Sequence, residues 1–249
     1  MKCIKPSYEI LTDISPYGTL ELEEIERAAR TCYKSEDKYE DQGESAKKLI
    51  RKLIDSGHEA MLEHSSLSVK FICDRGVSHE LVRHRLASFA QESTRYCNYS
   101  KDKFGHEITV IIPPWINEKY LPKDDEAVEV TKMLLFGPNT EAAKYRLNRM
   151  TAEERTAIIW WTSCFEDEAG YFAMLDEGFT PQQARCILPN SLKTEIVVTA
   201  NYREWRHILK LRTDPSAHPQ MRELMVPLLN DLTDRIGVIF DDIKESRRD

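Results

Sequence analysis

Hydrophobic and polar positions repeat with two different periods in the first third of the chain. Apolar residues recur at helical spacing over residues 20–35 (LELEEIERAARTCYKS) and 44–57 (ESAKKLIRKLIDSG). This spacing predicts two amphipathic helices, the second of which ends at Gly57. Residues 66–73 (SLSVKFIC) alternate instead and are rich in β-branched residues, which predicts a half-buried strand. A first strand is expected over residues 8–14, ahead of both helices.

The remainder of the chain mixes short strands with helices. Strands are expected over residues 107–114, where Pro113 and Pro114 stop the run, and over 191–202. Helices are expected over residues 77–85, 124–133, 140–148, 153–176, 203–212 and 221–243. A further short helix is expected to begin after Thr180, which is a suitable N-cap residue and is followed by Pro181 in the first turn. The order lacks regular β-α-β alternation, so we predict an α+β fold with a mixed or antiparallel sheet flanked by helices. No linker of Pro, Gly and Ser divides the sequence, which predicts a single domain over residues 1–249.

Composition limits the possible partners. The formal net charge is −7, which disfavours a surface devoted to duplex nucleic acid or to an anionic membrane. The sequence contains no run of ~18 apolar residues and no cleavable apolar leader, so we expect a cytoplasmic protein. The six cysteines are far apart and form no CxxC pair, so neither a metal site nor a disulfide framework is predicted.

The segment RHRLASFAQESTR, residues 83–95, is the densest basic cluster. Because successive helical side chains lie about 100° apart, Arg83, His84 and Arg85 cannot share one helical face. They are expected to serve two ligand groups or two subunits. Ser93 and Arg95 are two residues apart, which in an extended segment places both on one side, as a phosphate or a base edge requires. The segment predicts a binding site for an anion.

A second basic segment lies over residues 201–212, where only Glu204 offsets the positive charges. Its cations are Arg203, Arg206, Lys210 and Arg212. Taken alone, this segment is equally consistent with a helix of surface salt bridges. Together the two basic segments predict a shared anionic ligand.

A zinc site is the alternative interpretation of SGHEAMLEH, which contains His58, Glu59 and His64. The two histidines are six residues apart, roughly 240° around a helix, whereas a metalloprotease helix needs a spacing of four. We therefore favour a substrate contact for His58 over a metal-dependent hydrolase. The chain also contains neither GxGxxG nor a Walker sequence, so a dinucleotide must bind without a Rossmann or P-loop cradle.

Four ordered motifs resemble those of the flavin-dependent thymidylate synthases. RHR followed by seven residues, Ser, one residue and Arg is the signature of this family, and it spans residues 83–95 here. The other motifs are GHE-x-x-x-EH at 57–64, ARCILP containing Arg185, and NYREWRHILKLR followed by AHPQ at 217–220. The resemblance covers most of residues 57–220 and is weak between 101 and 180.

The resemblance implies a reaction and its participants. The enzyme would methylate dUMP to dTMP with 5,10-methylenetetrahydrofolate as carbon donor, NADPH as reductant and FAD as hydride carrier, releasing tetrahydrofolate. It would be a homotetramer whose active sites combine several subunits. By position, the residues resembling the dUMP site are Glu80, Arg83, Gln91, Glu92, Ser93, Thr94, Arg95, Arg185 and Arg212. Those resembling the FAD site, which is of a non-Rossmann type, are Arg83, His84, Arg85, Gln91, Asn201, Arg203 and His207. His58 resembles the histidine on the folate side.

The residue types suit this chemistry. Hydride addition to a uracil ring builds negative charge on its carbonyls, and a fixed guanidinium such as Arg212 stabilises that charge most in the transition state. Arg212 is therefore the expected catalytic residue. Ser93 has no accompanying base in the sequence and is interpreted as a substrate contact. Some family members have an acid in place of Gln91, so its contact to substrate or flavin is expected to be a neutral hydrogen bond instead of a charged one. Some have a threonine in place of Ala60, so one flavin contact and part of the FAD affinity are expected to be missing.

A non-catalytic nucleotide- or RNA-binding protein is the competing hypothesis. Such a protein would also use paired arginine clusters, but with basic and aromatic residues interleaved on one face and more positive charge overall. The net charge of −7 disfavours it.

Overall fold

The computed structural model describes residues 1–123, 145 and 148–246. Contacts group the chain into two compact units. The α6 unit, named after helix α6 (Ala152–Asp176), comprises Met1–Lys5, Asp74–Gly76 and Glu92–Thr194. The sheet unit comprises Pro6–Cys73, Val77–Gln91 and Glu195–Asp249. The helices predicted over 124–133 and 140–148 fall largely outside the described residues, and the single domain over 1–249 stays a prediction.

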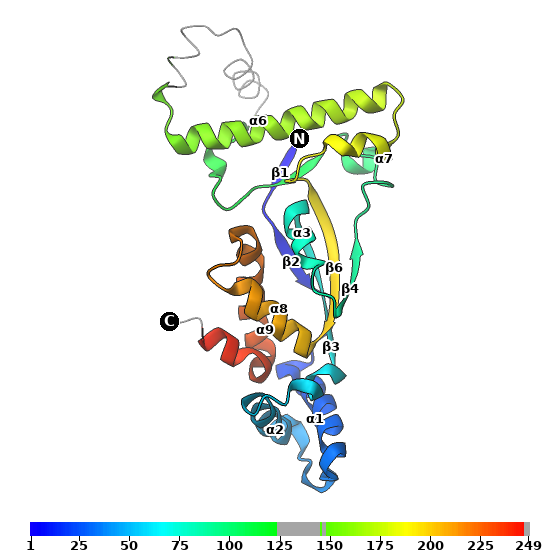
Figure 1. Cartoon of the computed structure of the whole chain (residues 1–249), viewed down its shortest axis with the longest axis vertical. Coiled ribbons are helices and arrows are strands. Elements are labelled where there is room, and N and C mark those ends of the chain that lie inside the picture. The colour runs from blue at the N-terminus through cyan, green and yellow to red at the C-terminus, as the bar shows by residue number, and fades with distance from the viewer. Residues whose placement is uncertain (124–144, 146–147, 247–249) are drawn as a thin grey trace. The chain divides into compact units, whose positions relative to one another are not determined.

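The sheet unit is built on a four-stranded sheet with strand order β2-β3-β6-β4 (Figure 1). Its strands are β2 (Ser7–Ile10), β3 (Ser66–Asp74), β4 (Ala87–Gln91) and β6 (Lys193–Asn201). β2 pairs antiparallel with β3, and β4 pairs antiparallel with β6. Alternate residues of β3 and β6 are buried, as the period-two pattern predicts. The sheet thus has one face on the core.

Helices pack against this sheet through one continuous apolar core. They are α1 (Thr19–Tyr33), α2 (Glu44–Asp55), α3 (Arg75–Leu81), α8 (Tyr202–Thr213) and α9 (Pro219–Glu245), with the 3-10 turns η1 (Pro16–Gly18), η2 (Glu36–Lys38), η3 (Asp41–Gly43) and η4 (Glu59–His64). α1 contacts α2 and η4, while α8 contacts α9 and η4. Helix α9 contains Pro227 and a non-helical Ile236, so it is not straight over its whole length.

Helix α8 supplies most of the candidate site. The Asn201 side chain caps it by accepting a hydrogen bond from the backbone amide of Glu204 at 2.9 Å. The indole nitrogen of Trp205 donates to the carbonyl of Leu67 on β3 at 2.9 Å, which ties the buried face of α8 to the sheet. His207 on the same helix is exposed.

The α6 unit contains a two-stranded parallel sheet and a long helix. β1 (Lys2–Ile4) pairs with β5 (Thr109–Ile111). Among its described residues, the helical elements besides α6 are α7 (Pro181–Ala184), η5 (Asp102–Phe104), η6 (Glu118–Tyr120) and η7 (Arg185–Ile187). Helix α6 begins at a capping box of Thr151 and Glu154. Apolar residues of α6 and β5, including Tyr171 and Val110, form a core separate from that of the sheet unit.

Several predicted boundaries are wrong in instructive ways. Strands β1 and β4 escaped the sequence analysis because three and five residues are too few to display a period. The strand predicted over 8–14 ends at Ile10, because the Ser68 amide donates to the Thr12 hydroxyl at 2.8 Å instead of to a ladder carbonyl. The helix predicted over 77–85 is α3, which ends at Leu81.

Among the described residues, no helix combines the length and apolar character needed to cross a lipid bilayer.

Candidate functional site

The three residues Arg83, His84 and Arg85 lie in a turn after α3. The amides of Arg83 and His84 donate to the carbonyls of Glu80 and Leu81, three residues back, which closes the helix. His84 is buried with 5 % exposure, whereas both arginines are exposed. Neither arginine side chain has a hydrogen-bond or ion-pair partner among the described residues. One imidazole therefore faces the protein while two guanidiniums remain available to a ligand.

Arg212 lies in the last turn of α8, and all three of its guanidinium nitrogens donate hydrogen bonds within the protein. Its Nε donates to His84 Nε2 at 3.0 Å, its Nη1 donates to Glu80 Oε2 at 2.6 Å, and its Nη2 donates to the Glu80 carbonyl at 3.0 Å. A guanidinium has five N–H donors in a rigid fork. Two donors thus remain for a substrate, on a side chain whose orientation is already fixed.

His84 accepts this hydrogen bond as a neutral ring. Burial, the Arg212 charge and His207 together lower the pKa of His84 to about 4. Since an arginine keeps its protons at any physiological pH, His84 Nε2 must be the unprotonated nitrogen. The ring proton is then on Nδ1, which faces Glu204 Oε1 at 3.6 Å.

A cavity of about 590 Å³ opens beside this cluster, and we call it the α8 pocket. Its lining residues come from η4, the turn after α3, the end of β6 and α8: Glu59, Glu63, Leu86, Asn201, Arg203, Glu204, Arg206, His207 and Lys210. Three predicted FAD residues, Asn201, Arg203 and His207, are thereby brought together. The His207 ring is edge-on to His84, with centroids 5.8 Å apart. The volume is in the usual range for small-molecule sites.

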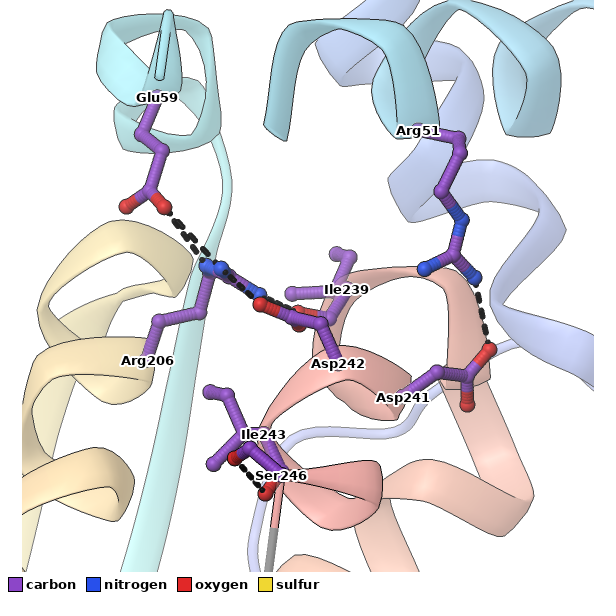
Figure 2. Close-up of polar contacts among 8 residues, drawn as sticks. All are labelled: Arg51, Glu59, Arg206, Ile239, Asp241, Asp242, Ile243 and Ser246. Carbon is purple, nitrogen blue, oxygen red and sulfur yellow. Dashed lines mark hydrogen bonds and ion pairs between the residues drawn. The ribbon is translucent and has the colours of Figure 1, made fainter. Parts of the chain in front are cut away.

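The arginines of the α8 pocket differ in how they are neutralised. Arg203 is paired with Glu63 at 2.5 Å on an exposed surface. Arg206 is 2 % exposed and bonds Glu59 at 3.0 Å and both Asp242 oxygens at 2.7 and 2.8 Å, together with the Ile239 carbonyl (Figure 2). Arg206 is therefore a structural clamp between η4, α8 and α9 rather than a free ligand for an anion.

Sequence reasoning assigned no flavin role to Glu59, Glu63, Glu204, Arg206 or Lys210. Arg206 and Lys210 were counted only as charges of the basic segment, and Glu59 only as a candidate metal ligand. The sequence did contain one signal for a shared site. Residues 203, 206, 207 and 210 are three, four or seven positions apart, which is the spacing of residues that lie near one another on a helix. Only tertiary contacts separate the paired cations from the available ones.

His58 lines a neighbouring cavity of about 430 Å³ within the sheet unit. Its walls are mostly apolar and come from α1, α2 and η4, with Cys32, Tyr33, Leu53 and Met61 among them. Glu59 and Arg203 border this cavity as well as the α8 pocket. The two spaces are therefore adjacent, and the side chain of His58 belongs to the more apolar one.

In the α6 unit, Ser93 and Arg95 lie in a tight turn instead of the predicted extended segment. The amides of Tyr96 and Cys97 both donate to the Ser93 carbonyl. The Ser93 hydroxyl also accepts the Arg95 amide at 3.3 Å, a local bond that competes with extended structure. The interpretation of Ser93 and Arg95 as neighbours on one side of a strand is wrong for this reason.

The turn is nevertheless cationic. Arg185, at the start of η7, donates to the Thr94 hydroxyl at 3.3 Å, and Arg95 Nε donates to Gln182 Oε1 at 3.0 Å. Arg95 and Arg185 are exposed and have no carboxylate partner among the described residues of the unit. Thr94, Arg95 and Arg185 thus form a cluster with unused donors, as the dUMP prediction requires of them.

Two other predicted dUMP residues bond within the protein. The Glu92 carboxylate accepts from Lys193 at 3.0 Å and from the Tyr99 hydroxyl at 3.4 Å. Gln91, at the end of β4, donates from its amide nitrogen to the Ser78 hydroxyl at 2.9 Å. Their orientation is therefore set by protein contacts.

The described residues contain one group of three potential metal ligands within 4.8 Å of one another: His84, Glu204 and His207. It differs from the set His58, Glu59 and His64 of the hydrolase hypothesis. His84 Nε2 already accepts from Arg212, and a cation so close to a guanidinium would be repelled by it. The geometry therefore suits a hydrogen-bonded network better than a metal centre.

Comparison with known proteins identifies the family. The family model described as thymidylate synthase complementing protein matches residues 19–236. The flavin-dependent thymidylate synthase of Corynebacterium aurimucosum is 33% identical over 219 residues, covering 88% of this chain and 78% of that protein. That of Mycolicibacterium vanbaalenii is 31% identical over 221 residues, with the same coverage. The chain belongs to the flavin-dependent thymidylate synthase family.

A solved structure supports the fold. Thymidylate synthase X from Helicobacter pylori, crystallised with FAD and dUMP, has a TM-score of 0.66 and 22% sequence identity, covering 96% of this chain and 98% of that one. The α+β fold and the family resemblance drawn from the four motifs are both confirmed. The roles of individual residues stay predictions.

Three cysteines of this flavin-dependent thymidylate synthase family member are unsuited to act as a thiol nucleophile. Burial raises the pKa of Cys3 to about 11 and that of Cys164 to about 12, and it also raises the pKa of Cys97. These three side chains are protonated at neutral pH, and the thiolate is the nucleophilic form.

Proposed function

We propose that this protein converts dUMP to dTMP by reductive methylation. The carbon comes from 5,10-methylenetetrahydrofolate, the reducing equivalents come from NADPH through FAD, and tetrahydrofolate is released. The methylene carbon gains two electrons and a proton in becoming the methyl group, and NADPH becomes NADP⁺. The observation that carries the proposal is the guanidinium of Arg212, fixed by Glu80 and His84 with two N–H donors left over.

The role of Arg212 follows from charge development in the substrate. Attack on a uracil ring moves negative charge onto the ring carbonyls, and a preorganised cation stabilises this charge more than it stabilises the neutral ring. Arg212 is 16% exposed, so its charge is only partly screened by water. Neutral His84 adds no competing charge. The donors of Arg212 are therefore directed at the substrate without reorganisation during the reaction.

The α8 pocket fits a flavin cofactor. Asn201, Arg203 and His207 would hold FAD there, and the exposed Arg83 and Arg85 would contact its phosphates from the turn after α3. When bound and reduced by NADPH, the flavin would supply the hydride. Polar side chains lining the pocket would orient a planar cofactor, and unpaired guanidiniums suit a diphosphate. The apolar cavity at His58 would receive the folate, with the imidazole as a polar contact.

The dUMP phosphate would bind at the Thr94, Arg95 and Arg185 cluster. Two exposed guanidiniums and a hydroxyl match a dianion, and neither guanidinium is paired with a carboxylate in the part of the unit that the structure describes. Glu80, Arg83, Gln91, Glu92 and Ser93 complete the proposed substrate contacts.

The proposed assembly is a cytoplasmic homotetramer with shared active sites. Val82 and Leu86 flank the two available arginines and are 41% and 75% exposed. Apolar side chains beside unpaired cations are typical of surfaces that another subunit covers. Light scattering during size-exclusion chromatography tests the stoichiometry directly.

The reaction is tested by incubating the protein with dUMP, methylenetetrahydrofolate and NADPH, with and without added FAD, and by measuring dTMP by mass spectrometry. FAD-dependent dTMP formation is expected. If dUMP binds but no dTMP forms under any condition, the chain is a non-catalytic nucleotide-binding protein and the proposal fails.

A further inference from the structure

Glu204 is a buried acid with no Lys or Arg side chain as an ion-pair partner among the described residues. It is 8% exposed, and its carboxylate oxygen lies 3.6 Å from His84 Nδ1. The nearby arginines are committed elsewhere: Arg203 pairs with Glu63 and Arg206 with Glu59 and Asp242. Carboxylates are seldom buried unless a nearby group compensates their desolvation. The imidazole of His84 is the group that Glu204 faces.

The single proton of neutral His84 lies on Nδ1, the ring nitrogen that faces Glu204. Arg212 Nε donates to His84 Nε2 at 3.0 Å, which requires a lone pair on Nε2 and a proton on Nδ1. The other tautomer would place an N–H against the Arg212 N–H and remove the bond. At 3.6 Å, Glu204 and Nδ1 are too far apart for a direct hydrogen bond, but a buried negative charge there still favours the Nδ1 proton.

We propose that Glu204 is a positioning residue that acts on Arg212 through His84. Its charge keeps His84 in the tautomer that accepts from Arg212 Nε, while Glu80 holds both Nη atoms. The chain of contacts Glu204, His84, Arg212 then directs the remaining two guanidinium donors. This inference rests on the proposed function, because the orientation of Arg212 affects turnover only if Arg212 activates the substrate.

Kinetics on matched variants test the inference. In Glu204→Gln the carboxylate charge is lost with little change in shape, so kcat for dTMP is expected to fall about tenfold or more while KM for dUMP changes little. Glu204→Asp restores the charge and is expected to recover much of kcat. Glu23→Gln, at a comparably buried acid on α1 with 9% exposure, is the control and keeps wild-type kcat.

A double-mutant cycle separates positioning from general damage to the fold. His84→Gln retains an acceptor for Arg212 but has no tautomers, so adding Glu204→Gln in that background is expected to cause no further loss. Equal losses from Glu204→Gln in the presence and absence of His84 would overturn the inference. So would a Glu204→Gln enzyme with unchanged kcat.

Crystal structures of the wild type and Glu204→Gln provide a readout that needs no turnover. We expect the bond from Arg212 Nε to His84 Nε2 to be lost in the variant, with the ring rotated. An unchanged bond would overturn the inference, as would anomalous density for a metal ion between His84, Glu204 and His207. If the wild type forms no dTMP, the proposed function fails, and the crystal structures still decide whether Glu204 positions Arg212.

Discussion

Two groups of arginines in this protein differ in what neutralises them. In the sheet unit, Arg206 and Arg212 are held by carboxylates of the protein and by fixed acceptors. In the α6 unit, Arg95 and Arg185 are exposed, and among the described residues their side chains donate hydrogen bonds only to an amide oxygen and a hydroxyl. The first group is ordered before any ligand arrives. The second has charge left over for a ligand.

Because the two groups of arginines are neutralised differently, we expect them to have different functions. A guanidinium fixed by protein acceptors can act on charge that develops during a reaction, because no orientation has to be gained at that moment. A guanidinium without an acid partner gains most from an anion present in the ground state, such as a phosphate. We therefore expect Arg212 to affect turnover and Arg95 and Arg185 to affect affinity.

Arg212→Ala provides the largest test of this contrast. Turnover is expected to fall by about three orders of magnitude, equivalent to roughly 4 kcal/mol of transition-state stabilisation, while the circular dichroism spectrum is retained. Arg212→Lys keeps the charge but loses the planar guanidinium, so its turnover is expected to lie between those of the wild type and Arg212→Ala. Near-normal dTMP formation by Arg212→Ala would remove the role assigned to this residue.

Arg206→Ala tests whether Arg206, an arginine held by carboxylates of the protein, stabilises the fold. The change leaves Glu59 and Asp242 without their shared cation, so the free energy of unfolding is expected to drop by about 3 kcal/mol. Arg51→Ala is the matched control, since Arg51 makes one bond of 2.9 Å to Asp241 and both side chains are about a third exposed (Figure 2). Its loss is expected to cost about 0–1 kcal/mol. Equal effects in urea unfolding would mean that Arg206 is no clamp.

The sequence predicts the parts of the fold whose period repeats over several turns or strand residues. Helix α6 and strand β3 lie within one residue of their predicted bounds, because a long, largely apolar run and a clear alternating run have few competing interpretations. Strand β4 is five residues and is defined by pairing with β6, which is a tertiary contact. The end of α3 was misjudged because Arg83 and Arg85 are compatible with a helix, and the turn depends on burial of His84.

The motifs predict which residues gather at the candidate site better than they predict how each residue is bonded. Asn201, Arg203 and His207 were chosen by resemblance, and they do line one pocket. The partnership of Glu80 with Arg212 spans more than a hundred residues and leaves no local signal. Glu204 is similarly inconspicuous, because its burial against His84 depends on the packing of α8 on the sheet. Charge alone therefore could not separate the fixed arginines from the available ones.

The pH dependence of the free energy of unfolding tests whether His84, which accepts a hydrogen bond from Arg212, is neutral in the folded protein. His84 has a folded pKa of about 4 against an ordinary value of 6.5, so between these values the unfolded chain binds more protons. Stability contributed by the neutral ring is complete above pH 6.5 and is lost as pH falls toward 4, by roughly 3 kcal/mol in total. His84→Gln is expected to remove this part of the slope in urea unfolding at fixed protein concentration. His106→Gln, at an exposed imidazole, should leave the slope unchanged, and a wild-type slope in His84→Gln would contradict the buried neutral ring.

Arg95→Ala and Arg185→Ala test the available group and have the smallest expected effect. Each removes one charge-assisted contact to the proposed phosphate, worth about 1.5–2.5 kcal/mol, so the Kd for dUMP should rise roughly tenfold to seventyfold. Because neither arginine is paired with an acidic side chain among the described residues, the free energy of unfolding should barely change. Calorimetric titration with deoxyuridine, which lacks the phosphate, supplies the control: its weak binding should be the same in the wild type and both variants. If deoxyuridine loses as much affinity as dUMP, these arginines contact the nucleoside or maintain the shape of the site, and the contrast between arginines that act on turnover and arginines that act on affinity would not hold.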